Sequence, residues 1–336
     1  MLTLAFAARV RERGLLMKYA LIAGFVLGCG LAGAAQAASF DCAKAATPME
    51  KAICASPDLS RADDALATAF KKALSGLSPA GQGLLRTDQR GFLTHVGMVC
   101  GKDDGMDAEC LTSQFSDRAG NLGKAVTRLG GWTFVTITTY HGSDHRLTML
   151  QIDSPGATAW NAWAKAQVET AYEMTDESQN GKPLPGTTVT VGMSVTNASP
   201  DLISVRVEST AEDGGMGGDD NRSTAATWLV RPAHDLTGKD LFDPARPWAT
   251  ALVPAAQKHL VDGDGNPDKT HKIKRLDQAG GDWMITAKGL SITYDDWRTV
   301  DGRPGAETDL SWAELKPYLR KDLPFDPAMI VAAPAN

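Results

Sequence analysis

Two short polar segments contain residue types that could hold a metal ion. Residues 141–145 (HGSDH) place two imidazoles and a carboxylate close together, and such side chains bind zinc. They lie between two β-rich stretches, so we interpret them as a polar hairpin turn. Residues 262–268 (DGDGNPD) begin like a calcium loop, but Pro267 stands where glycine is needed and Ile273 where a bidentate glutamate belongs. We interpret this segment as an ordinary acidic loop and expect no metal or other cofactor.

No motif of an established enzyme class is present. The sequence lacks G-x-S-x-G, H-E-x-x-H and P-loop patterns. A cell-wall hydrolase would need a pair of acids in one cleft, which a sequence alone does not place. We therefore predict a binding protein and not an enzyme.

The N-terminus predicts export. Lys18 is followed by an apolar run and then by the small residues at 35–37 (AQA), the pattern of a cleaved signal peptide. We expect residues 1–37 to be removed, with Met17 as the effective start. Cys29 faintly resembles a lipoprotein site, but we favour cleavage after Ala37. No later stretch approaches the ~20 apolar residues of a membrane span, so a periplasmic or secreted protein is expected.

Four cysteines remain in the mature chain. They lie within one short region, and an even number in an oxidising compartment predicts a disulfide framework. The spacings lack the short C-x2-C pairs of zinc sites. Three pairings are open; two local pairs are the simplest, and each would stabilise by roughly 3 kcal/mol on the chain-entropy model. The four are Cys42, Cys54, Cys100 and Cys110.

Charge is distributed unevenly along the chain. Residues 38–128 carry 11 basic and 11 acidic side chains, whereas residues 129–336 carry 19 basic and 28 acidic. This balance argues against nucleic acid as a partner. It favours a cationic partner for the second half, although acidity also keeps an exported protein dissolved.

The elements that position these residues change in type along the chain. Residues 47–50 (TPME) form a capping box that starts a helix ending near Cys54. Ser56 or Asp58 caps a second helix, Ser78-Pro79 opens a third, and apolar positions from 111 to 129 predict a fourth. From residue 130 the pattern predicts strands joined mostly by hairpins, with a helix near 157–174 and another near 248–260.

These patterns predict an α+β fold in two domains. Residues 38–129 would form a small helical domain with two disulfides, and residues 130–323 a mainly antiparallel α+β domain. Residues 324–336 are expected to be a loose tail. We interpret Trp160 and Trp163 as helix-to-sheet packing and not as a sugar-stacking platform.

Two loops of the second half are candidate partner contacts. A glycine-rich acidic loop spans residues 212–222; its carboxylates would repel phosphate but could meet arginine or lysine. A second loop offers aromatic and arginine side chains, which commonly carry interface energy, although its tryptophan could equally be core. The candidates are Asp213, Gly214, Gly215, Met216, Asp219, Asp220, Trp297, Arg298, Arg303 and Pro304.

The helical half resembles the LprI-like lysozyme-inhibitor family over residues 40–122. The resemblance rests on FDC at 40–42, TPMEKAIC at 47–54, LSRADDAL at 59–66 and CLTSQFSDR at 110–118. The chain departs from the family at Phe92 and Val96, in the region where the family shows tryptophan and arginine.

Residues 155–320 resemble the extracytoplasmic domain of RsiV-type anti-sigma factors and PdaC-like cell-wall proteins. The carriers are DLISVRVESTAEDGG, WLVRPAHDLTGKDLF, WMITAKGLSITYDDW and LSWAELKPYL. The chain departs from it at residues 214–217 and 297–305.

Both resemblances imply contact with lysozyme. They suggest an exported protein that captures lysozyme-type muramidases and inhibits them by occluding the cleft. The alternative is a non-enzymatic module of the cell envelope that binds peptidoglycan or another glycan. Fold resemblance alone does not decide between them.

Overall fold

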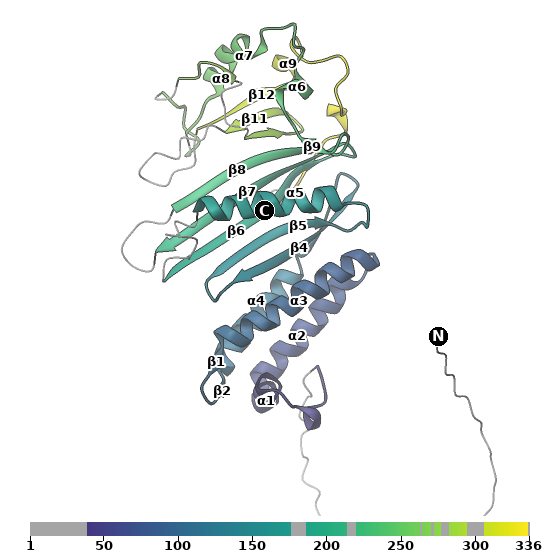
Figure 1. Ribbon diagram of the computed structural model, residues 1–336, viewed down its shortest axis with the longest axis vertical. Helices are drawn as coiled ribbons and strands as arrows, with labels where there is room; N and C mark the ends of the chain where they lie inside the picture. Colours follow the sequence, from purple (N-terminus) through teal and green to yellow (C-terminus); the bar gives the residue numbers. More distant parts are fainter. Residues whose placement is uncertain are drawn as a thin grey trace, which may run out of the picture. The chain divides into compact units, whose positions relative to one another are not determined.

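The computed structural model describes residues 39–175, 186–213, 220–262, 264–269, 272–276, 282–293 and 306–334. Residues 37–336 group into one compact unit, shown in Figure 1. The predicted division between residues 129 and 130 stays a prediction. None of the helices in the described part of the chain is long and apolar enough to cross a lipid bilayer.

Helices with side-chain caps build most of the N-terminal part. Thr47 forms the predicted capping box with Glu50, and the hydroxyls of Ser56 and Ser78 accept backbone N–H groups at the next two helix starts. Asp107 caps the last helix in the same way. The elements are η1 (Cys42–Lys44), α1 (Pro48–Ala55), α2 (Pro57–Leu74), α3 (Pro79–Val99), β1 (Gly101–Lys102), β2 (Gly105–Met106) and α4 (Ala108–Leu122).

Both disulfides join neighbouring elements, as the local pairing predicts. Cys42 is bonded to Cys54, with Cα atoms 5.7 Å apart, and links η1 to α1. Cys100 is bonded to Cys110, with Cα atoms 5.6 Å apart, and links the end of α3 to the first turn of α4.

The fourth helix is shorter than the sequence pattern predicts. α4 ends at Leu122, and residues 126–129 form a strand instead. Val126 and Leu129 keep a helical spacing from Leu122, but antiparallel pairing with β4 satisfies their backbone in extended form. The prediction of a helix through residue 129 is therefore wrong, because tertiary pairing overrides the local period.

A large sheet forms the centre of the described chain. Adjacent strands of this sheet pair antiparallel, except β5 and β6. These two strands are parallel, and α5 (Thr158–Thr175) connects them. The predicted α+β class with a mainly antiparallel sheet is confirmed. The strands are β3 (Val126–Leu129), β4 (Trp132–His141), β5 (His145–Ile152), β6 (Thr187–Ala198), β7 (Leu202–Asp213), β8 (Asp220–Leu229), β9 (His234–Asp235) and β13 (Val331–Ala332).

α5 covers one face of this sheet (Figure 1). Its Trp160 and Trp163 are buried and pack with β-branched residues of β6 and β7 in one apolar cluster. The prediction that these tryptophans serve helix-to-sheet packing is confirmed. A second cluster joins α1 to α4 and includes Val135 of β4, so the helices share core with the sheet.

A small antiparallel sheet lies against the large one through hydroxyl groups. Ser204 Oγ donates to the Ile285 carbonyl (2.8 Å), and Thr227 Oγ1 accepts from Ile285 N–H (2.9 Å) and donates to the Trp283 carbonyl (3.2 Å). These side chains satisfy the open edge of the first strand. The sheet contains β10 (Trp283–Ile285), β11 (Gly289–Thr293) and β12 (Glu307–Ser311), with α6 (Gly238–Leu241), α7 (Trp248–Ala251), α8 (Val253–His259) and α9 (Trp312–Leu315) around it.

The C-terminal segment is docked and not loose. Phe325 and Ile330 are buried in the cluster around the small sheet, and β13 pairs with Asn197 and Ala198 of β6. The expectation of a loose tail at residues 324–336 is wrong for its described part, because two apolar side chains and a strand pairing hold it.

Candidate functional site

The structure places the predicted contact residues only in part. Asp213 ends β7 and Asp220 begins β8, and these strands pair as far as Ala211 opposite Asp220. They form the two sides of a long hairpin. The remaining candidates lie outside the described residues: Gly214, Gly215, Met216, Asp219, Trp297, Arg298, Arg303 and Pro304.

A small hairpin in the helical part presents two further carboxylates. β1 and β2 pair through Gly101 opposite Met106 and Lys102 opposite Gly105, so Asp103 and Asp104 form the turn. Both aspartates are exposed.

The base of this hairpin is fixed on both sides. The disulfide between Cys100 and Cys110 encloses it, and Lys102 Nζ lies 3.0 Å from Asp107 Oδ2. Lys102 lowers the pKa of Asp107, with help from the backbone N–H of Cys110. Because Lys102 is engaged at the base, the two turn carboxylates have no ion-pair partner among the described residues. No sequence motif signals this hairpin, because it depends on where α3 ends and α4 begins.

Helix α3 runs along β4 and delivers the hairpin to one end of the large sheet. Near its start, the Asp153 carboxylate accepts the backbone N–H of Ser78 (2.9 Å) and of Gly81 (2.8 Å). Near its end, the His95 ring stacks on Tyr140, with centroids 4.0 Å apart. The residues that follow α3 therefore emerge beside the β4–β5 turn.

A buried ion pair fixes the middle of α3. Asp88 bonds Arg118 of α4, and the two side chains are 0% and 8% exposed. Asp88 Oδ1 also accepts the backbone N–H of Thr138 on β4 (2.7 Å), while Arg118 Nε donates to Gln89 (3.1 Å). Its guanidinium lies 5.3 Å from the Phe92 ring centroid. Asp88 thus connects two helices and a strand with a fully hydrogen-bonded carboxylate.

The two positions that depart from the family pattern are core residues. Phe92 is 3% exposed and Val96 is 0% exposed, both in the helical cluster. Their side chains pack inside the helical cluster.

We define the turn end as the turn at 142–144 and the β7–β8 hairpin at one end of the large sheet, together with residues 103–104 of the separate β1–β2 hairpin that follows α3. Strand register brings the ends of β5, β6 and β7 to the same level, because His145 lies opposite Val189, which lies opposite Ala211. The exposed carboxylates of the turn end in the described chain include Asp144 and Glu212 besides those of the small hairpin. Exposed carboxylates gathered in this way can bind a cationic surface.

The HGSDH segment forms the predicted hairpin turn between β4 and β5. His145 is buried, with Nε2 3.1 Å from the Thr187 carbonyl and Nδ1 2.8 Å from Tyr172 Oη. Because a carbonyl only accepts, Nε2 donates to it, and Nδ1 shares a hydrogen bond with the tyrosine hydroxyl. In the DGDGNPD loop, the Asp262 carboxylate accepts the backbone N–H groups of Asp264 and Asn266. These side chains stabilise their own turns.

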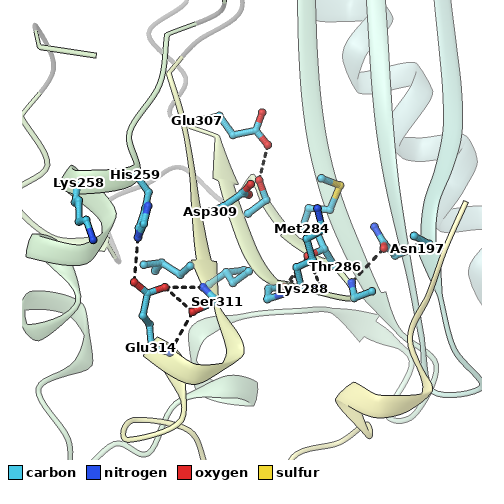
Figure 2. Close-up of a pocket in the computed structure, with 16 residues that line it drawn as sticks. Asn197, Lys258, His259, Met284, Thr286, Lys288, Glu307, Asp309, Ser311 and Glu314 are labelled. Carbon is cyan, nitrogen blue, oxygen red and sulfur yellow. Dashed lines mark hydrogen bonds and ion pairs between the residues drawn. The ribbon is translucent and has the colours of Figure 1, made fainter. Parts of the chain in front are cut away.

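A groove of about 740 Å³ lies over the polar face of the small sheet. Register places Met284, Ser291 and Asp309 in one row on that face, while the opposite face enters the core. Figure 2 shows Lys258 of α8 at one side of the groove and Asn197 of β6 at the other. No sequence motif signals this site, because its lining residues come from seven separate elements that only the folded chain brings together.

One wall of the groove contains serine, histidine and glutamate, but not in the order of a hydrolase. Glu314 is central: it accepts from Ser311 Oγ (2.6 Å) and N–H (2.9 Å), and from His259 Nε2 (3.0 Å). A nucleophile needs the histidine next to the serine. Hydrogen bonds from Ser311, followed by His259, lower the pKa of Glu314 to about 2. Glu314 is therefore ionised near neutral pH and cannot act as a general acid there.

Comparisons with known proteins agree with part of the sequence analysis. Residues 42–122 match the family model described as lysozyme inhibitor LprI, which confirms the first resemblance. The chain is also similar to two solved structures of the DUF3298 family. The Bacteroides fragilis protein has TM-score 0.40 and 10% identity, covering 58% of this chain and 96% of that one. The Pseudomonas aeruginosa protein has TM-score 0.38 and 14% identity, covering 56% and 95%. No curated protein gives a significant match. The RsiV/PdaC resemblance stays a prediction.

Proposed function

We propose, from the match of residues 42–122 to a lysozyme-inhibitor family, that the protein binds lysozyme-type muramidases outside the cytoplasm and inhibits them by occluding their cleft. The match is the observation that carries the proposal. The two disulfides support it, because such bonds persist in oxidising compartments. We also propose cleavage after residue 37 and a periplasmic or secreted mature chain.

The turn end is the surface that we assign to this binding. Asp103 and Asp104 lie on a cross-linked hairpin, so little conformational entropy is lost when they meet a partner. We assign further contacts to Asp213, Asp219 and Asp220, and to the loop at residues 297–304. Inhibition in this way requires no catalytic residue, since the bound loops need only exclude the polysaccharide.

An inhibition assay tests the proposal. The purified mature protein, residues 38–336, should slow cell-wall lysis by at least one lysozyme class, and calorimetry should detect its complex with that lysozyme. Asp103→Asn and Asp104→Asn should each weaken binding by roughly fivefold, the value of about 1 kcal/mol for an exposed pair. Asp117→Asn is the matched control, because Asp117 is an exposed carboxylate on α4 outside the turn end. Equal losses of affinity in all three variants would show that the turn end is not the binding surface.

The second candidate function is binding to peptidoglycan or another glycan without inhibition. The groove over the small sheet offers a site for peptidoglycan, because its size falls in the usual range for ligand sites. Sedimentation with isolated sacculi separates the two functions: a lysozyme inhibitor stays in the supernatant, and a wall-binding module sediments.

A further inference from the structure

We infer that the groove over the small sheet binds a short acidic peptide that carries at least two carboxylates and one free amino group. This inference does not depend on lysozyme inhibition. It rests on which charged side chains of the groove already have a partner among the described residues and which do not; we call the latter open.

Two cations in the lining are open. Lys258 on α8 and Lys288 in the β10–β11 turn both line the groove and are exposed. Neither forms an ion pair with a described residue, since the ion pairs of the small sheet and its helices use other side chains. Two ammonium groups are therefore free to bind anionic groups of a ligand.

Of the three carboxylates in the lining, two are occupied. Glu314 accepts three hydrogen bonds from Ser311 and His259. Glu307 accepts from the Ser291 hydroxyl and lies 3.5 Å from the Arg206 guanidinium. The third, Asp309, is exposed and has no hydrogen bond or ion pair to a described side chain. The open charges are thus two positive and one negative.

The rest of the lining suits a peptide backbone. The apolar side chain of Met284 lies among serine hydroxyls and the Asn197 amide, whose Oδ1 accepts the Ala287 N–H. Mixed apolar and polar lining is typical of ligand sites. In Figure 2, Asp309 and Lys288 lie between Lys258 and Asn197, so the open charges are spread along the groove.

Other ligand classes fit these charges less well. A neutral glycan would leave three charges without partners, and the described lining has no aromatic ring except the His259 imidazole for a sugar to stack on. A compact phosphate would engage a lysine but would be repelled by Asp309. A peptide with separated carboxylates and an amine can pair with all three. Stem peptides of peptidoglycan carry this combination, and so do acidic protein tails.

The test is a titration of the isotope-labelled mature protein, residues 38–336, in which amide chemical shifts are recorded by NMR. The probe is the stem tripeptide L-alanyl-γ-D-glutamyl-meso-diaminopimelate. Shifts should be confined to α8, the β10–β11 turn and β12. Lys258→Met and Lys288→Met should each weaken binding about fivefold. Lys124→Met is the control, because Lys124 is exposed on the helical part, and it should change nothing.

Modifying the ligand assigns each charge. Asp309→Asn should weaken binding of the free tripeptide but not of a tripeptide whose amines are acetylated. A neutral tetramer of N-acetylglucosamine should give no shifts. Tighter binding of the stem tripeptide than of L-Ala-L-Glu-L-Lys points to the cell wall as the source, and the reverse points to protein tails; both support the site. No groove shifts at about 10 mM tripeptide, or equal binding by both lysine variants and wild type, would overturn the inference.

Discussion

Asp88→Ala should strongly destabilise both the helices and the large sheet. The substitution leaves Arg118 buried without its carboxylate and leaves the Thr138 N–H without its acceptor. Breaking a buried pair costs about 3–5 kcal/mol, which is a large share of a typical unfolding free energy of about 5–15 kcal/mol. Arg118→Met should cost less in the Asp88→Asn background than alone, because no unpaired charge then remains.

Urea unfolding with two probes measures this effect. All eight tryptophans lie at or after residue 132, so fluorescence reports the sheet part, whereas circular dichroism at 222 nm reports helices. Because Asp88 connects α3 to β4, both midpoints should fall together in the variant. Asp58→Ala, which removes an exposed carboxylate paired with Arg61, is the control and should cost below about 1 kcal/mol. A loss below about 1 kcal/mol for Asp88→Ala, or a shift of the helical signal alone, would refute the reasoning.

Three further perturbations test other parts of the structure. Burial, followed by nearby Arg146, lowers the pKa of His95, so the free energy of unfolding should fall as pH drops below the ordinary histidine pKa near 6.5. His95→Phe should reduce this acid sensitivity in pH-dependent unfolding, because phenylalanine does not titrate. The lowered pKa of Glu314 contributes to the free energy of unfolding; this contribution is complete above about pH 4.5 and is lost as pH falls toward 2. Glu314→Gln should therefore flatten the dependence of the unfolding free energy on pH in this range. Gly289→Ala should lower the melting temperature, because a Cβ there would collide with the Leu310 carbonyl.

Local chemistry made the helix starts and the disulfides predictable. The capping box at Thr47 depends only on neighbouring residues, and so does the cap at Ser78. The cysteines lie close in sequence and bridge the ends of adjacent elements. In these cases the residues that form the sequence pattern also make the contacts that form the structure.

Long-range pairing decided the features that the sequence did not reveal. Val126 and Leu129 fit a helix until their partner strand is known. The end of the chain reads as a tail until Phe325 is placed in the core of the small sheet. The open charges of the groove come from separate elements, and only the register of β10, β11 and β12 places Asp309 among them. No local period encodes such contacts.

The most direct measurement of the central claim is the dissociation constant between the mature chain, residues 38–336, and purified lysozymes of several classes, measured by calorimetry alongside a lysis assay. We predict a complex with at least one class, tighter than about 100 μM, weakened by added salt and accompanied by inhibition. Absence of binding below about 100 μM for every class, in protein with both disulfides intact, would contradict the account.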